Sequence, residues 1–171
     1  LLFDEDGRVY MVSGNMNIRL TELTADANAI KPGGIDKVII ENAISVTGRS
    51  GTLAEGSHIH KVNGYYYIFL IAWPQGQGRQ QIVYRSKNIE GPYEGRVVLN
   101  DAGVAQGGIF DTPKGDWYAM LFQDHGAVGR IPYLVPVTWE DGWPVFGENG
   151  KLPASIPLPS NDRTLPGIVS S

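Results

Sequence analysis

Short apolar runs separated by glycine-containing turns recur along the whole chain. Three segments share one order, in which an apolar run passes through a tight turn into an aromatic run: LLFDEDGRVYMVSG, SHIHKVNGYYYIFLIAW and GGIFDTPKGDWYAMLFQD. The turn glycines Gly7, Gly64 and Gly115 can adopt positive φ, which tight β-hairpins require. Each segment therefore predicts a hairpin of two antiparallel strands.

A third run with alternating polar and apolar residues follows each hairpin: NIRLTELTAD, QIVYRSKNIEG and IPYLVPVTWEDG. A unit of roughly 50 residues with three or four antiparallel strands has the size of a β-propeller blade. The sequence thus predicts an all-β fold with about three blades, at residues 1–47, 55–101 and 105–147. An ordinary β-sandwich with recurrent hairpins is the alternative, but the repeated order of aromatic strand, loop and polar strand favours the propeller.

Two stretches do not follow the repeat. Residues 24–43 offer the best candidate for a long helix, but Pro32 and the glycines after it break the pattern, which favours a strand end, a long loop and another short strand. Residues 148–171 are rich in Pro and Ser and predict a linker or wrapping segment that leads toward a C-terminal β-sandwich domain. Because propellers close with about four to eight blades, we expect further blades from the same gene or from a partner chain.

Composition narrows the classes of function. The 171 residues include 22 Gly, 11 Pro and no Cys, and the formal net charge is -4. A weakly acidic chain is poorly suited to nucleic acid or anionic membranes, which need clustered Lys and Arg, so neutral ligands fit better. The missing cysteines exclude thiol catalysis and disulfides within the chain. The sequence does not fix the compartment, although a secreted or periplasmic location is favoured over a cytoplasmic one.

The innermost strand of a propeller blade lines the central channel, and here it comes first in each unit. Glu55 opens the second unit in the sequence AEGSHIHK, and Gln106 opens the third in AQGGIF. Glu55 follows Leu53 and Ala54, and a carboxyl in such an apolar setting holds its proton more tightly, as a general acid must. The alternative is that Glu55 is a solvent-exposed glutamate in a loop without a catalytic role. Neighbouring glycines such as Gly56 allow backbone or ligand to approach closely.

Three further side chains are candidates for the site. Arg130 follows the loop HGAVG and could hold sugar hydroxyls or restrain a carboxylate, or form a surface salt bridge. His125 is a candidate ion or water ligand, or a hydrogen-bonded loop residue. Trp73 ends an aromatic strand before the loop PQGQGRQ and could stack on a sugar ring or pack in the core. Asp4 to Asp6 are expected to form a solvated turn without a catalytic role.

Taken together in one order and at blade spacing, these motifs resemble glycoside hydrolase family 43, the five-bladed propeller enzymes that act on xylan and arabinan side chains. The resemblance runs from LLFDEDGRVYMV through EGSHIHKVNGYYYIF and RSKNIEGPYEG to AQGGIFDTPKGDWYAMLFQDHGAVGRIPYLVPVTWEDGWPVFG. It is nearest to the branch of β-xylosidases and α-L-arabinofuranosidases that carry a C-terminal β-sandwich.

The resemblance implies roles for individual residues. Glu55 matches the acid glutamate of an E-G-[PS]-H motif, and Arg130 matches a pocket arginine in VGRIPYL. Many relatives have a central histidine where this chain has Gln106, a departure from the family pattern. Relatives often hold a structural calcium or sodium ion on the propeller axis, and His125 is the candidate ligand. No cofactor is expected to be required for the chemistry.

The resemblance also implies what the chain lacks. The family's general-base aspartate and its pKa-modulating aspartate would both lie before Leu1, so the chain would supply the last three blades and the acid without the base. The expected activity is inverting hydrolysis of xylo- or arabino-oligosaccharides as a β-xylosidase, an α-L-arabinofuranosidase or both. The competing expectation is a propeller that binds carbohydrate without catalysis. A protein-interaction propeller is disfavoured because the sequence shows no broad apolar or charged rim.

Overall fold

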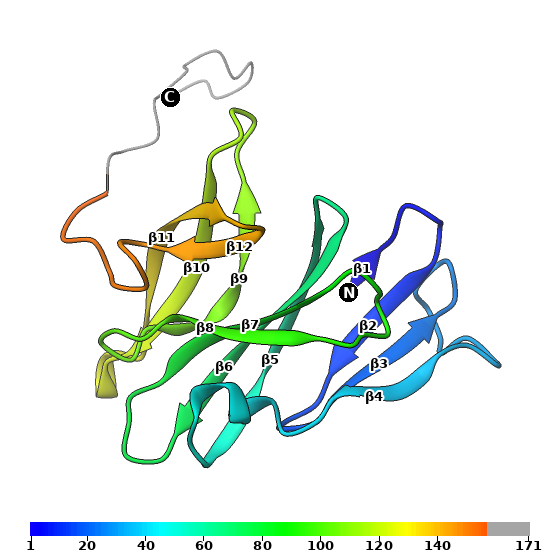
Figure 1. Cartoon of the computed structure of the whole chain (residues 1–171), viewed down its shortest axis with the longest axis horizontal. Helices are drawn as coiled ribbons and strands as arrows, with labels where there is room; N and C mark the ends of the chain where they lie inside the picture. Colours follow the sequence, from blue (N-terminus) through cyan, green and yellow to red (C-terminus); the bar gives the residue numbers. More distant parts are fainter. Residues whose placement is uncertain (157–171) are drawn as a thin grey trace.

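The computed structural model describes residues 1–156, which form three antiparallel sheets and two short 3₁₀ helices (Figure 1). The first sheet has the order β1-β2-β3-β4, and its strands are β1 (Leu2–Phe3), β2 (Val9–Ser13), β3 (Ile18–Leu23) and β4 (Asp36–Ile40). The second sheet has the order β5-β6-β7-β8, with β5 (Gly51–Val62), β6 (Tyr65–Pro74), β7 (Gln80–Ser86) and β8 (Glu94–Leu99). The third contains β9 (Ala105–Asp111), β10 (Trp117–Asp124), β11 (Arg130–Glu140) and β12 (Trp143–Phe146).

Each sheet is a four-stranded meander in which every strand pairs with the next one in sequence. This arrangement confirms the predicted all-β fold with three propeller blades. The 3₁₀ helices η1 (Ala43–Thr47) and η2 (Gly126–Val128) were not predicted. No helix in residues 1–156 has the length and apolar character needed to cross a membrane. Most of the predicted linker, residues 157–171, lies outside the described residues, so the linker stays a prediction.

The three predicted hairpin glycines occupy tight turns. Gly7, Gly64 and Gly115 have φ values of 80°, 77° and 84°, a region that other residues rarely adopt. The N–H of Gly7 donates to the carbonyl of Asp4 at 3.0 Å, and that of Gly115 donates to the carbonyl of Thr112 at 2.8 Å. The hairpins therefore form at the positions that the turn glycines predict.

The second sheet lies between the other two and is buried on both faces. Ile68 and Leu70 of β6 pack toward the first sheet, whereas Tyr67 and Phe69 pack toward the third. Because successive strand residues point to opposite faces, a strand covered on both sides needs a continuous apolar run, and YYYIFLIAW supplies it. The innermost strands then converge, since β5 contacts both β1 and β9. The strand that carries Glu55 thus lies at the hub.

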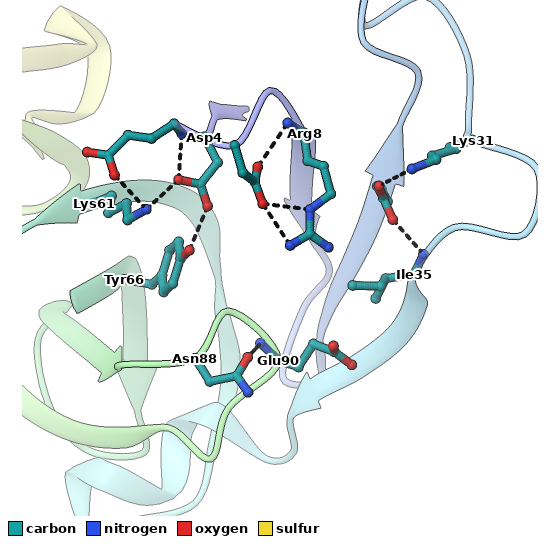
Figure 2. Close-up of polar contacts among 11 residues, drawn as sticks. Asp4, Arg8, Lys31, Ile35, Lys61, Tyr66, Asn88 and Glu90 are labelled. Carbon is teal, nitrogen blue, oxygen red and sulfur yellow. Dashed lines mark hydrogen bonds and ion pairs between the residues drawn. The ribbon is translucent and has the colours of Figure 1, made fainter. Parts of the chain in front are cut away.

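A buried carboxylate joins the first two sheets (Figure 2). The Asp4 side chain is 3% exposed and accepts hydrogen bonds from Lys61 Nζ at 2.6 Å and from the Tyr66 hydroxyl at 2.6 Å. Burial alone would raise the pKa of Asp4, but the hydrogen bonds from these groups and from the N–H of Glu5 outweigh it and hold the pKa below its ordinary value. The prediction of a solvated Asp4–Asp6 turn is therefore wrong for Asp4, although Asp6 does lie at the surface.

Candidate active site at the hub

Glu55 lies near the start of β5, directly opposite Ile71 of β6. Paired residues in an antiparallel sheet point to the same face, and the next positions of β6 on that face, Phe69 and Tyr67, pack toward the third sheet. The half-buried Glu55 side chain therefore points toward the third sheet and β9. Within residues 1–156, no hydrogen bond or ion pair engages its carboxylate. The group is held at the hub with its oxygens free to meet a ligand.

A strained segment of β9 stands next to Glu55. Gln106 has φ of 65°, and its N–H donates to Oε1 of the fully buried Gln81 at 2.8 Å, while Gln81 Nε2 donates to the carbonyl of Gly107 at 3.2 Å. The Gln106 side chain lies against Gly56, where an added Cβ would be 2.8 Å from Gln106 Nε2. Gln81 thus fixes the backbone that places the Gln106 amide beside the residue after Glu55.

Two histidines occupy the same stretch of β5. Both His58 and His60 pack against Gly108 of β9, and a Cβ there would lie 3.0 Å from His58 Nδ1 and 3.1 Å from His60 Nε2. Burial lowers the pKa of His58, and burial with the neighbouring His58 lowers the pKa of His60 to about 4. The neutral form of both imidazoles is therefore favoured, most strongly at His60.

A second polar cluster links the sheets near the β6–β7 and β10–β11 turns. Asp124 pairs with Arg79 and, at 3.4 Å, with Nε of Arg130. The Arg79 guanidinium carbon lies 4.9 Å from the Trp73 ring centroid, and that of Arg130 lies 4.4 Å from the ring centroid of Phe122. Trp73 is 43% exposed and the Arg130 side chain is 63% exposed. Asp124 therefore connects two predicted substrate-binding residues and restrains both arginines.

His125 follows β10 directly and is exposed. Its Nε2 shares a hydrogen bond with Gln123 Oε1, which also accepts the hydroxyl proton of Tyr133 at 2.9 Å. The described residues contain no group of three or more His, Asp or Glu side chains placed to hold a metal ion. The donor set at His125, one imidazole with an amide and a phenol, does not by itself fit a calcium or sodium site, which prefers several oxygen ligands. The axial ion stays a prediction.

The structure brings the candidate residues into two neighbouring groups. Glu55 lies with Gln106, and Trp73 is connected to Arg130, but no hydrogen bond or ion pair joins Glu55 to Arg130 within residues 1–156. Their chemical roles stay predictions.

Sequence reasoning missed three side chains that hold these groups in place, namely Gln81, Arg79 and Asp124. The one available signal was Gln81 itself, a polar residue at the start of the apolar run IVY, because buried amides need partners.

Comparisons with known proteins identify relatives of this arrangement. The family model described as "Glycosyl hydrolases family 43" matches residues 1–144. A solved structure described as a bifunctional GH43-CE protein of Bacteroides eggerthii has a TM-score of 0.87 and 56% sequence identity, covering 98% of this chain and 22% of that one. A β-xylosidase of Formosa agariphila is 35% identical over 80% of this chain and 25% of its own length.

A non-reducing end α-L-arabinofuranosidase of Bacteroides ovatus is 28% identical, with 67% of this chain and 25% of that protein covered. The chain thus spans about a quarter to a third of the length of the curated relatives it matches.

Proposed function

The chain belongs to glycosyl hydrolase family 43, and on that basis we propose that it carries the general acid of a glycosidase that cleaves xylo- or arabino-oligosaccharides with inversion. Relatives named β-xylosidase and α-L-arabinofuranosidase support this substrate class. In this proposal Glu55 is the acid.

The proposal depends mainly on the position of the Glu55 carboxyl and on its lack of partners within the described residues. The side chain is half-buried on the innermost strand of its sheet, faces β9, and has no hydrogen-bond or ion-pair partner among the described residues. Structural carboxylates in this chain, such as Asp4, are instead paired with cations. The Glu55 oxygens are not among the buried unpartnered polar atoms of residues 1–156, so they are open to a ligand, and the glycosidic oxygen is the partner that this proposal assigns to them.

The chemistry requires two carboxyl groups. Glu55 would give its proton to the glycosidic oxygen while a carboxylate on the other face of the sugar takes a proton from water, which attacks the anomeric carbon as the leaving sugar departs. Such carboxyls are separated by about 6.5–9.5 Å to leave room for the water. Arg130 and Gln106 would bind sugar hydroxyls near this bond, and Trp73 would stack on a ring.

The base and the pKa-modulating carboxylate are proposed to lie on blades outside residues 1–171. The outer faces of the first and third sheets support such blades, because each exposes large apolar side chains that point away from the second sheet: Phe3 and Val38 on one, Phe110 and Met120 on the other. Exposed apolar faces of this kind mark surfaces that pack against something.

The anomeric form of the product tests the proposal. Proton NMR of xylotriose hydrolysis by the full-length protein should show the α-anomer of xylose first if β-linked xylose is released with inversion. Early accumulation of the β-anomer would overturn the inverting mechanism. Saturable binding of xylotriose without any turnover would instead support the competing function, a propeller that binds carbohydrate without catalysis.

The isolated chain provides a second test. We expect residues 1–171 alone to be inactive, because loss of a catalytic proton-transfer group costs about 10²- to 10⁴-fold in rate. Adding the remaining blades as a separate polypeptide should restore hydrolysis if the two parts assemble. Turnover by the isolated, sequence-verified chain would contradict the proposed location of the base.

A further inference from the structure

Two adjoining hollows lie at the end of the second sheet where β5 begins. The first, of about 530 Å³, is lined by Ser50, Gly51, Thr52, Trp73, Pro74, Gln75 and Gly76. The second, of about 470 Å³, continues past the same serine and glycine to Met16, Asn42, Ile44, Ser45, Gly48 and Arg49. The two hollows adjoin at Ser50 and Gly51 and are together called the trough here. The volume of each half falls within the range of ligand clefts, about 300–1,000 Å³.

The floor of the trough is fixed by hydrogen bonds and close packing. The N–H of Gln75 donates to the Ser50 carbonyl at 2.8 Å, and the Ser50 hydroxyl donates to Gln75 Oε1 at 3.2 Å. A Cβ at Gly51 would lie 2.4 Å from the Trp73 carbonyl oxygen, so only glycine fits there. The indole N–H of Trp73 donates to the Gln77 carbonyl at 3.2 Å. The trough is therefore pre-formed, with its tryptophan held in place.

The trough begins one step along the sheet from Glu55. Glu55 is opposite Ile71, and Trp73 is the next residue of β6 that points to the same face. Diagonal neighbours in an antiparallel pair are separated by about 7–8 Å. A ligand that reaches the Glu55 carboxyl can therefore continue over the indole and into the trough.

We propose that this trough binds the leaving-group part of a xylo-oligosaccharide, two or more sugars beyond the bond that is cleaved. The inference rests on the proposed function. The sugar that is released lies between the acid and the base, and the base is proposed outside this chain. The trough lies on the side of Glu55 that is formed by this chain without the proposed further blades. We therefore assign the leaving sugars to that side.

The lining matches the surface of a neutral sugar chain. The Arg79 guanidinium lies over one face of the Trp73 indole, and the other face suits the C–H face of a pyranose ring. The amides of Gln75 and Asn42 and the hydroxyls of Ser50 and Thr52 suit its equatorial hydroxyls. Arg49 is the one charged residue among the described residues that line the trough. Its open shape fits a chain that runs out to solvent and does not enclose a single sugar.

Chain-length dependence tests the trough in the full-length protein. We expect Trp73→Ala to lower the ratio of kcat/KM for xylotetraose to kcat/KM for xylobiose about tenfold, because stacking on the indole is lost. Gln75→Ala should lower the same ratio about threefold. Gln77→Ala is the matched control, since it changes the same residue type in the same turn outside the trough and keeps the carbonyl that holds Trp73. It should leave the ratio unchanged.

The outcomes separate this inference from the proposed function. If both trough variants leave the ratio at its wild-type value, or if the control lowers it equally, the trough does not bind leaving sugars, whatever the role of Glu55. If the protein hydrolyses none of these substrates, calorimetric binding of xylohexaose decides. Weaker binding by Trp73→Ala and Gln75→Ala than by Gln77→Ala supports the trough, and equal binding by all three overturns it.

Discussion

Replacing Asp4 with Asn should destabilise the contact between the first two sheets. The substitution removes the negative charge that pairs with Lys61 and leaves an amide N–H₂ or a weaker acceptor facing the ammonium (Figure 2). Removal of one partner from a buried ion pair costs about 3–5 kcal/mol. Because Lys61 is 23% exposed and also contacts Glu5 at 3.2 Å, we expect a smaller loss, about 2 kcal/mol in the free energy of unfolding.

The effect should depend on pH in a defined direction. Hydrogen bonds hold the pKa of Asp4 below its ordinary value in the folded protein, so the unfolded chain binds the proton more tightly than the folded one. The carboxylate therefore adds stability above the unfolded pKa of about 3.9, and that stability is lost as the pH falls through the folded pKa. The difference between wild type and Asp4→Asn should be constant near neutral pH and vanish in strong acid.

Urea unfolding monitored by tryptophan fluorescence, at neutral pH and at a series of acid values, measures both effects. A loss of about 2 kcal/mol corresponds to about 4–8 °C in Tm for a chain of this size. Asp6→Asn is the matched control from the same turn, because the Asp6–Arg8 pair is exposed, and it should change little. Equal stability of wild type and Asp4→Asn, or a difference that persists in strong acid, would refute the reasoning.

Two other substitutions test the supports of the site. Asp124→Asn should raise KM for xylo-oligosaccharides about threefold with little change in kcat, because Arg130 loses the carboxylate that restrains it. Steady-state kinetics measures both constants, and a lower kcat with an unchanged KM would contradict this expectation. Gln81→Leu should lower the free energy of unfolding by about 3 kcal/mol, since it leaves the Gln106 N–H and the Gly107 carbonyl without partners. Urea unfolding measures this change. A free energy of unfolding equal to that of wild type within experimental error would show that Gln81 does not stabilise β9.

Local patterns predicted the strands of this fold well. The hairpins depend on turn residues and on the alternation of apolar positions, both of which act within a few residues, and Gly7, Gly64 and Gly115 adopt the positive φ that their turns require. Pro32 and the glycines after it broke the one helical pattern, and the short strand β4 follows that loop. The repeat could be recognised in the sequence because each blade is a meander of the same strand order and therefore has a similar pattern of apolar residues and turns.

Contacts between distant residues were beyond the sequence patterns. The sequence alone places Asp4 in an acidic surface turn, whereas in the fold it is covered by Lys61 and Tyr66, which lie 57 and 62 residues later in the chain. Two further contacts join different blades, and the relative positions of the blades are set only by folding. Gln81 forms hydrogen bonds with β9, and Asp124 pairs with Arg79. A buried polar side chain can be suspected from an apolar neighbourhood, but its partner cannot be identified without the fold.

The leaving-group dependence of Glu55→Gln tests the central claim most directly. In the full-length protein, kcat/KM for xylobiose should fall about 10²- to 10⁴-fold, because the departing sugar oxygen needs a proton. With 2,4-dinitrophenyl β-xyloside, whose leaving group needs little protonation, the loss should stay within about tenfold. Undiminished hydrolysis of xylobiose, or an equal loss on both substrates, would show that Glu55 is not the general acid.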